Sequence, residues 1–282
     1  MARELTGSGG RRRVLRVTSR PLPIAAQAAE LWAYRRLFWF LAWRDVKVRY
    51  KQTVVGVGWA LAQPLATMGV FTFVFGTMAG LPSGGRPYAL NTLAALVPWG
   101  FFATGLAAVS NSLVANGSLL RRAYFPRLVV PFSSLGITSV DFLVALGFLL
   151  GLAWTAGYPP AGRWLLLLPS FVVLAAFTAG VGIVFAVLNA MFRDVRHFVP
   201  FLTQLLLFAT PVAYSSELVP ERWRALLALN PLVSVMAGFR AAVLGAEPPG
   251  AELAWSMLSC AVVLTVAVLL FRRLELIVVD WI

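Results

Sequence analysis

The chain has 282 residues, of which 60% are hydrophobic and 12% are charged, and it carries a formal net charge of +13. Soluble domains carry about 25% charged residues, so this composition excludes a soluble enzyme and requires a lipid environment. The sequence predicts an all-α integral membrane protein.

The first 56 residues are predicted to lie on or outside the membrane. Residues 1–24 are expected to form a disordered basic cytoplasmic tail. Residues 25–56 follow as an interfacial segment, because 25–53 lack proline and mix aromatic with charged side chains. On a helical wheel a cationic stripe lies beside a largely aromatic one, as in an N-terminal amphipathic helix at the membrane interface. The alternative is an anchor that only fixes tilt. The two stripes are Arg36, Arg44, Lys47 and Lys51, and Trp39, Trp43, Val46 and Tyr50.

Six apolar stretches follow that approach the length of a membrane span. A bilayer core of about 30 Å needs roughly 20 apolar residues per helix. The fifth stretch is the shortest, and Pro64 inside the first predicts a kink. The predicted spans of the domain 57–271 are 57–80, 92–115, 131–157, 164–190, 199–214 and 252–271.

Between the fifth and sixth spans lie two apolar pieces, 223–229 and 232–245, split by Asn230-Pro231. Each is too short to cross a bilayer, so we expect re-entrant or interfacial half-helices. A seventh span over 225–244 would place Arg272 and Arg273 on the outer side and break the charge rule. We therefore predict six spans.

Most of the 24 Lys and Arg residues flank one side of these spans. Short cationic loops stay in the cytoplasm during insertion, so both termini are predicted to be cytoplasmic, including a tail at 272–282, and the protein to lie in the cytoplasmic (inner) membrane. The same clusters beside spans explain the basic charge by topology and anionic lipid. Nucleic acid is not expected as a partner.

The sequence predicts that this chain carries no catalytic site of its own. It contains no G-x-x-x-x-G-K-[ST] phosphate-binding loop, and its only histidine, His197, lies in a basic loop. The lone Cys260 falls within the sixth apolar stretch and supplies no cysteine-based metal site. We expect no catalytic residue, no metal and no cofactor on this chain.

Asp141 is the only acid deep in a predicted span, about ten residues from each end of the third. A charge at that depth requires a partner or a wet cavity. Two interpretations remain open: a structural role at a helix interface, or a place on a translocation path.

Four segments, in this order and spacing, resemble the membrane subunits of ABC exporters for lipid-linked polysaccharides and teichoic acids, the Wzm/TagG-like permeases of the type-2 ABC exporter fold. The likeness covers nearly the whole chain from about residue 30. The segments are RDVKVRYKQTVVGVGWALAQPL (44–65), YFPRLVVPFSS (124–134), FRDVRHFVPFLTQLLLFATPVAY (192–214) and NPLVSVMAGFRAAVLG (230–245).

The resemblance implies a homodimer that pairs with two copies of a P-loop ATP-binding subunit, which carries the ATP and Mg. The cargo it implies is a polyprenyl-linked glycan of O-antigen, galactan, capsule or teichoic-acid type. The loop after the second span would be a coupling helix, although cytoplasmic charge and an aromatic belt explain its residues equally well. The implied coupling residues are Arg121, Arg122, Tyr124, Phe125, Pro126 and Arg127, with Tyr124 and Phe125 as apolar anchors.

By the same resemblance, the segment before the first span is a gate helix that contacts the ATPase. Gly56 and Gly58 let the chain turn there into the membrane. The gate residues are Arg44, Asp45, Lys47, Arg49, Tyr50, Lys51, Gly56 and Gly58.

A glycan channel needs flat apolar faces that hold sugars weakly, and aromatic rings supply them, although many membrane aromatics face lipid instead. The nearest rival function is an ABC drug or lipid efflux permease. An ATP-independent carrier or channel is disfavoured by the scarcity of buried charge. The candidate channel-lining residues are Trp59, Phe71, Phe75, Trp99, Phe102, Asp141, Phe201, Phe208 and Tyr214.

Overall fold

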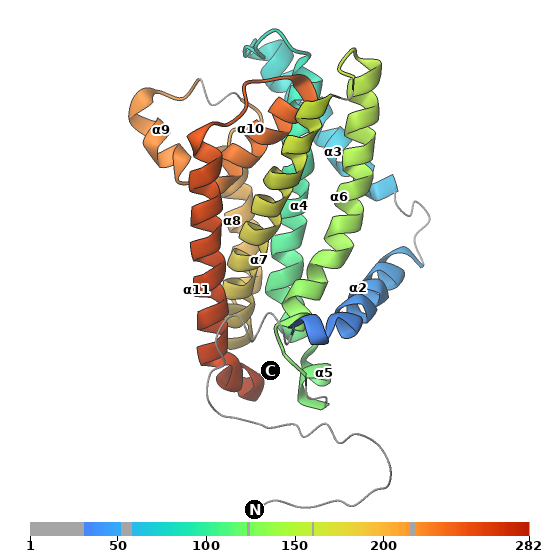
Figure 1. Cartoon of the computed structure of the whole chain (residues 1–282), viewed down its shortest axis with the longest axis vertical. Coiled ribbons are helices and arrows are strands. Elements are labelled where there is room, and N and C mark those ends of the chain that lie inside the picture. The colour runs from blue at the N-terminus through green and yellow to red at the C-terminus, as the bar shows by residue number, and fades with distance from the viewer. Residues whose placement is uncertain (1–30, 52–57, 123–124, 160, 215–217, 282) are drawn as a thin grey trace, which may run out of the picture.

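The computed structural model describes residues 31–51, 58–122, 125–159, 161–214 and 218–281, and all regular structure in those ranges is helical (Figure 1). This confirms the all-α prediction. The predicted tail at 1–24, and with it Gly56 and Tyr124, lies outside the described residues.

Five of the six predicted spans correspond to helices long and apolar enough to cross a membrane. Most boundaries differ from prediction by only a few residues. The last helix differs more, because it continues past the predicted end at 271 through Arg272 and Arg273. The five are α3 Gly58–Phe71 continuing into a π-helix Thr72–Met78, α4 Tyr88–Ala115, α6 Val129–Thr155, a 3₁₀ turn Gly162–Leu166 leading into α7 Leu167–Met191, and α11 Ala251–Trp281.

The remaining predicted span, 199–214, is not confirmed at spanning length. Its helix, α8, covers Val195–Ala209, which is 15 residues or about 22 Å at 1.5 Å per residue. It ends directly before Thr210-Pro211, because a residue that precedes proline is disfavoured in the α conformation and proline lacks an N–H.

The two pieces between α8 and α11 form separate helices, α9 Glu221–Ala228 and α10 Pro231–Leu244. The predicted break at Asn230-Pro231 is present. The Asn230 side chain accepts a bond from Leu232 N–H at 3.1 Å, Pro231 occupies the first turn, and Gly245 closes the helix at φ 65°. All but one residue of α10 are buried, so protein, rather than lipid, surrounds this short helix.

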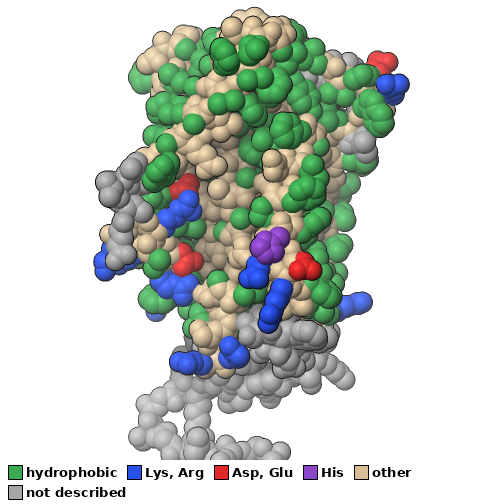
Figure 2. Space-filling view, turned by 180° about the vertical axis from the view of Figure 1, so that it is seen from behind, with side chains coloured by type: hydrophobic (Ala, Val, Ile, Leu, Met, Phe, Trp, Pro, Cys, Tyr) green, Lys and Arg blue, Asp and Glu red, His purple; other side chains and the backbone are tan. Residues whose placement is uncertain are grey.

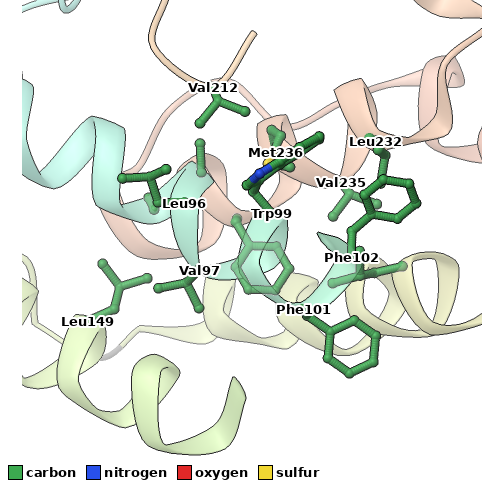
Figure 3. Packing of buried hydrophobic residues seen from close by; sticks show 14 of the residues in the cluster. Leu96, Val97, Trp99, Phe101, Phe102, Leu149, Val212, Leu232, Val235 and Met236 are labelled. Carbon is green, nitrogen blue, oxygen red and sulfur yellow. The ribbon is translucent and has the colours of Figure 1, made fainter. Parts of the chain in front are cut away.

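The core consists of two clusters around α4, the helix with the most buried residues. The upper cluster joins α4 to α6, α7 and α10, and Figure 3 shows part of it, with Trp99, Phe101 and Phe102 of α4 beside Val235 and Met236 of α10. The lower cluster joins α4, α6, α7 and α11 to α2 Arg35–Tyr50. By contrast, α3 has no buried residue.

Charge divides the surface of the bundle. In Figure 2 the Lys and Arg side chains gather toward the lower part of the face shown, while apolar side chains cover most of its upper part. That lower end carries α5 Gly117–Arg122, the start of α2 and the last turns of α11 (Figure 1). The bundle therefore has one cationic end.

Glycine permits close packing of α7 on α11. A Cβ atom added at Gly180 would lie 3.1 Å from the backbone N of Leu264, whereas one at Gly147 of α6 would meet nothing within 4 Å. We expect Gly180→Val to destabilise the protein by about 1–3 kcal/mol, because backbone must move. Thermal melting in detergent checks this against Gly147→Val, and equal midpoints for the two variants would contradict it.

Candidate gate and coupling site

Helix α2 packs against α6 and approaches it closely at Gly136. Leu41 and Ala42 are the buried residues of α2, and a Cβ added at Gly136 of α6 would come within 2.6 Å of the Ala42 methyl. The large side chains on the opposite face, Trp39, Phe40 and Trp43, are exposed. This asymmetry fits a helix with one face on the bundle and the other on lipid or solvent.

The end of α2 is tied to α6 through Asp141. Arg49 Nη2 lies 3.1 Å from Asp141 Oδ2, and the Tyr50 hydroxyl donates a hydrogen bond to Asp141 Oδ1. The Asp141 side chain is only 14% exposed, against 48% for Arg49. Burial, followed by the bond to Asp141, raises the pKa of Tyr50 to about 12. The phenol therefore stays protonated and remains a donor.

A second tie joins α2 to the start of α5. Arg44 Nε and Nη2 donate to Asp45 Oδ1 at 3.0 and 2.8 Å, and Nη2 also donates to Asn116 Oδ1 at 2.8 Å. Asn116 ends α4 and directly precedes α5. The predicted gate helix thus bonds to the residue directly before α5, which leads to the first predicted coupling residue, Arg121. Sequence reasoning missed Asn116, although a polar N-G-S turn after a span was a usable signal.

Only some of the predicted coupling residues are exposed. Arg121 and Arg122 are exposed in the last turn of α5. Phe125 is 8% exposed and packs in the lower core cluster, so the anchor role predicted for it does not fit its position. Arg127 donates to the Glu275 carbonyl at 3.0 Å and lies 3.8 Å from its carboxylate. The outward-facing cations are therefore Arg121 and Arg122, with Pro126 partly buried behind them.

The predicted channel aromatics fall into three groups, since Phe71, Phe75 and Tyr214 are partly buried. Trp59, Phe201 and Phe208 are exposed, whereas Trp99 and Phe102 are 7% and 0% exposed and belong to the core. We exclude Phe102 from the lining, because a fully enclosed ring offers no face to a cargo. Phe71 and Phe75, on the predicted shared face, meet edge to face at 5.5 Å, and the Tyr214 hydroxyl donates to the Phe208 carbonyl.

A cavity of about 190 Å³ opens beside the Arg49–Asp141 pair. It lies between the end of α2, the first turns of α3 and the middle of α4 and α6. Among its lining side chains are Trp59, Gln63 and Thr138. Asp141 therefore fits both interpretations left open by the sequence, because it holds two helices together and also borders a cavity.

Arg240 of α10 is a functional candidate that the sequence analysis missed. It is 8% exposed, and it donates to the backbone carbonyls of Asn91 at 3.3 Å, Tyr214 at 3.5 Å and Val212 at 2.8 Å. The Tyr88 hydroxyl bonds to the Ala213 carbonyl in the same segment. Arg240 therefore fixes the chain that follows α8.

These features describe a helical membrane protein in which α2 is bonded to the short loop after α4. Comparison with known proteins identifies its family. The sequence profile of the ABC-2 type transporter family matches residues 36–244. The chain therefore belongs to the ABC-2 type transporter family, which confirms the predicted resemblance.

Among its relatives are permeases named for polysaccharides. The O-antigen export system permease protein RfbA of Myxococcus xanthus is 32% identical over 237 residues, covering 83% of this chain and 90% of the relative. RfbA of Klebsiella pneumoniae is 31% identical over 200 residues, covering 70% and 76%. The polysialic acid transport protein KpsM of Escherichia coli is 24% identical over 238 residues, covering 82% and 91%.

Proposed function

We propose that this chain is the permease subunit of an ABC exporter that carries a polyprenyl-linked polysaccharide across the cytoplasmic membrane. The observation that carries the proposal is the similarity to O-antigen permeases over 83% of the chain. The names of those relatives state that they transport a polysaccharide, and the family consists of ABC transporters. The chain thus serves as a transport subunit and not as the ATPase.

We assign the topology from charge and burial. The cationic end, with α5, the start of α2 and the end of α11, is placed in the cytoplasm. Helix α8 with residues 210–214 completes a sixth crossing, and α9 and α10 form the half-helices on the outer side. The burial of α10 supports this, because short helices at membrane depth are tolerated only inside protein.

The assembly that follows contains two copies of this chain and two copies of a P-loop subunit that binds ATP and Mg. Arg121 and Arg122 are exposed at the cytoplasmic end, where they suit an acidic rim on that subunit. The exposed apolar surfaces of α3 and α8, which include Trp59, Phe201 and Phe208, are assigned to the dimer and its channel.

In this assembly a movement of the ATPase passes from α5 through Asn116 to Arg44 of the gate helix α2. We expect Arg44→Leu to lower export about fivefold, because it removes a partly exposed bond worth about 1 kcal/mol between α2 and Asn116. ATP hydrolysis by the complex is expected to continue. The measurement is export per ATP hydrolysed, with Arg36→Leu, an exposed cation of the same helix, as control. Equal coupling in both variants would contradict this route.

Depleting the protein in its host tests the function. Mass spectrometry of polyprenyl-linked glycans in the cytoplasmic leaflet is expected to show accumulation of one lipid-linked polymer, which also names the cargo. Unchanged pools with new sensitivity to apolar drugs would instead favour an efflux permease of the same fold.

A further inference from the structure

The cavity beside Asp141 combines features that suit one particular ligand. It is lined by aromatic rings, an ion pair, an amide and three threonine hydroxyls, and it measures about 190 Å³. Pockets for drug-sized ligands measure about 300–1,000 Å³, so this one admits a single small unit. We propose that it is a subsite for one sugar ring of the transported glycan, an inference that rests on the proposed function.

The aromatic face comes from Trp59, in the first turn of α3. Its indole is 63% exposed although it borders the cavity, so the ring is open on one side. The electron-rich face of an indole attracts the weakly positive C–H groups of a sugar. This contact holds a ring without the desolvation cost of binding a charge, which suits a cargo that must be released.

The polar edge comes from α2 and α6. A carboxylate accepts about four hydrogen bonds, and two positions on Asp141 are occupied by Arg49 and Tyr50. Asp141 can therefore accept from sugar hydroxyls while it keeps both partners. The Arg49 guanidinium has five N–H donors and is half exposed, so it can donate to hydroxyl or ring oxygens from the same side.

The cavity is also lined by Gln63 and by three threonines, Thr67, Thr104 and Thr138. Gln63 is exposed one helical turn after Trp59. Thr138 is 1% exposed, and its hydroxyl has no hydrogen-bond partner in the described part of the chain. A buried hydroxyl without a partner destabilises the folded state. A hydroxylated ligand, alone or through a water, compensates that cost.

The depth of the cavity along the helices favours a sugar over a lipid as its ligand. Asp141 lies twelve residues into α6, about 18 Å along the helix, and the α4 residues of the lining come from the middle of that helix. The phosphate of a resident bilayer lipid stays at the membrane surface, and a hydrocarbon chain gains nothing from an ion pair and hydroxyls. The phosphate of the cargo itself also passes this depth, and the crosslinking experiment below distinguishes it from the sugar. A glycan in transit passes this depth and brings hydroxyls to every polar group.

Photo-crosslinking in the complete exporter tests the subsite. p-Benzoylphenylalanine is placed at Gln63, or at Thr67 one turn further along the same cavity wall, and for comparison at Phe73, an exposed residue outside the cavity. Cells that make the lipid-linked polymer are irradiated, and the purified subunit is stained for periodate-sensitive glycan. Mild acid then cleaves the sugar–phosphate bond between glycan and lipid.

We expect glycan adducts at Gln63 or Thr67 at least tenfold above Phe73, with staining that survives mild acid because the bond is to the sugar. Staining that mild acid removes would show attachment through the lipid and overturn the proposal. Absence of adducts at both positions, in membranes that contain the polymer, would also overturn it. If cells depleted of the chain still export the polymer, the proposed function fails independently of any crosslink.

Discussion

Arg240→Met is expected to destabilise the protein more than any other single substitution considered at the α10 end of the bundle. Three backbone carbonyls, those of Asn91, Val212 and Tyr214, lose their donor, and methionine supplies none. Each buried group left without a partner costs about 1–3 kcal/mol, so the total reaches about 3 kcal/mol or more. The segment after α8 then loses its bonds to Arg240, while Tyr88 still donates to the Ala213 carbonyl and Asn230 to the Thr210 hydroxyl.

The measurement is the yield of monodisperse protein and its thermal midpoint in detergent. Arg222→Met is the control, because Arg222 is exposed and lies over the neighbouring Trp223 ring in cation–π geometry. We expect the control to melt like the wild type and Arg240→Met to melt far lower. Identical midpoints for the two variants would show that the carbonyls find other donors.

Asp141→Leu is expected to have the second large effect, on both stability and export. It removes the carboxylate that Arg49 and Tyr50 share, and breaking a buried pair on one side costs about 3–5 kcal/mol, less here because Arg49 is half exposed. Asp141→Asn is expected to be milder, since the amide oxygen still accepts from Tyr50. Thermal melting and export at matched protein levels are the readouts.

A double variant separates the two roles of Asp141. Combining Arg49→Met with Asp141→Leu removes both charges, so stability is expected to recover by about 1 kcal/mol or more relative to the sum of the single variants. Export is expected to stay at least tenfold below wild type, because the polar edge of the cavity is lost. Full recovery of export with stability would show that Asp141 serves only to join α2 and α6.

Hydropathy was sufficient to locate the long helices, because the membrane requires continuous apolar stretches. It located the ends of the helices less well, because a helix end depends on local residues rather than on hydropathy. The end of α11 was placed at 271 because Arg272 and Arg273 interrupt the apolar run, yet charges do not stop a helix that continues beyond lipid. The break at Asn230-Pro231 was predictable because capping and proline geometry act within a few residues.

Contacts between segments that are far apart in the chain could not be predicted from the sequence. Nothing local indicates that Asp141 meets Arg49, or that Arg44 meets Asn116, because these partners come together only when α2 folds onto the bundle. The same limit explains Phe125 and Phe102. Aromatic residues at such positions suit a partner surface, a channel or a core equally well, and only packing decides among them.

ATP-driven transfer of the glycan is the central claim, and inverted membrane vesicles that contain the complete exporter test it most directly. Lipid-linked polymer on the outer face of such vesicles is open to a membrane-impermeant oxidant such as periodate. We predict that ATP moves the polymer into a protected state, and that a non-hydrolysable analogue does not. Polymer that stays equally accessible with ATP, in vesicles whose partner subunit hydrolyses ATP, would contradict the account.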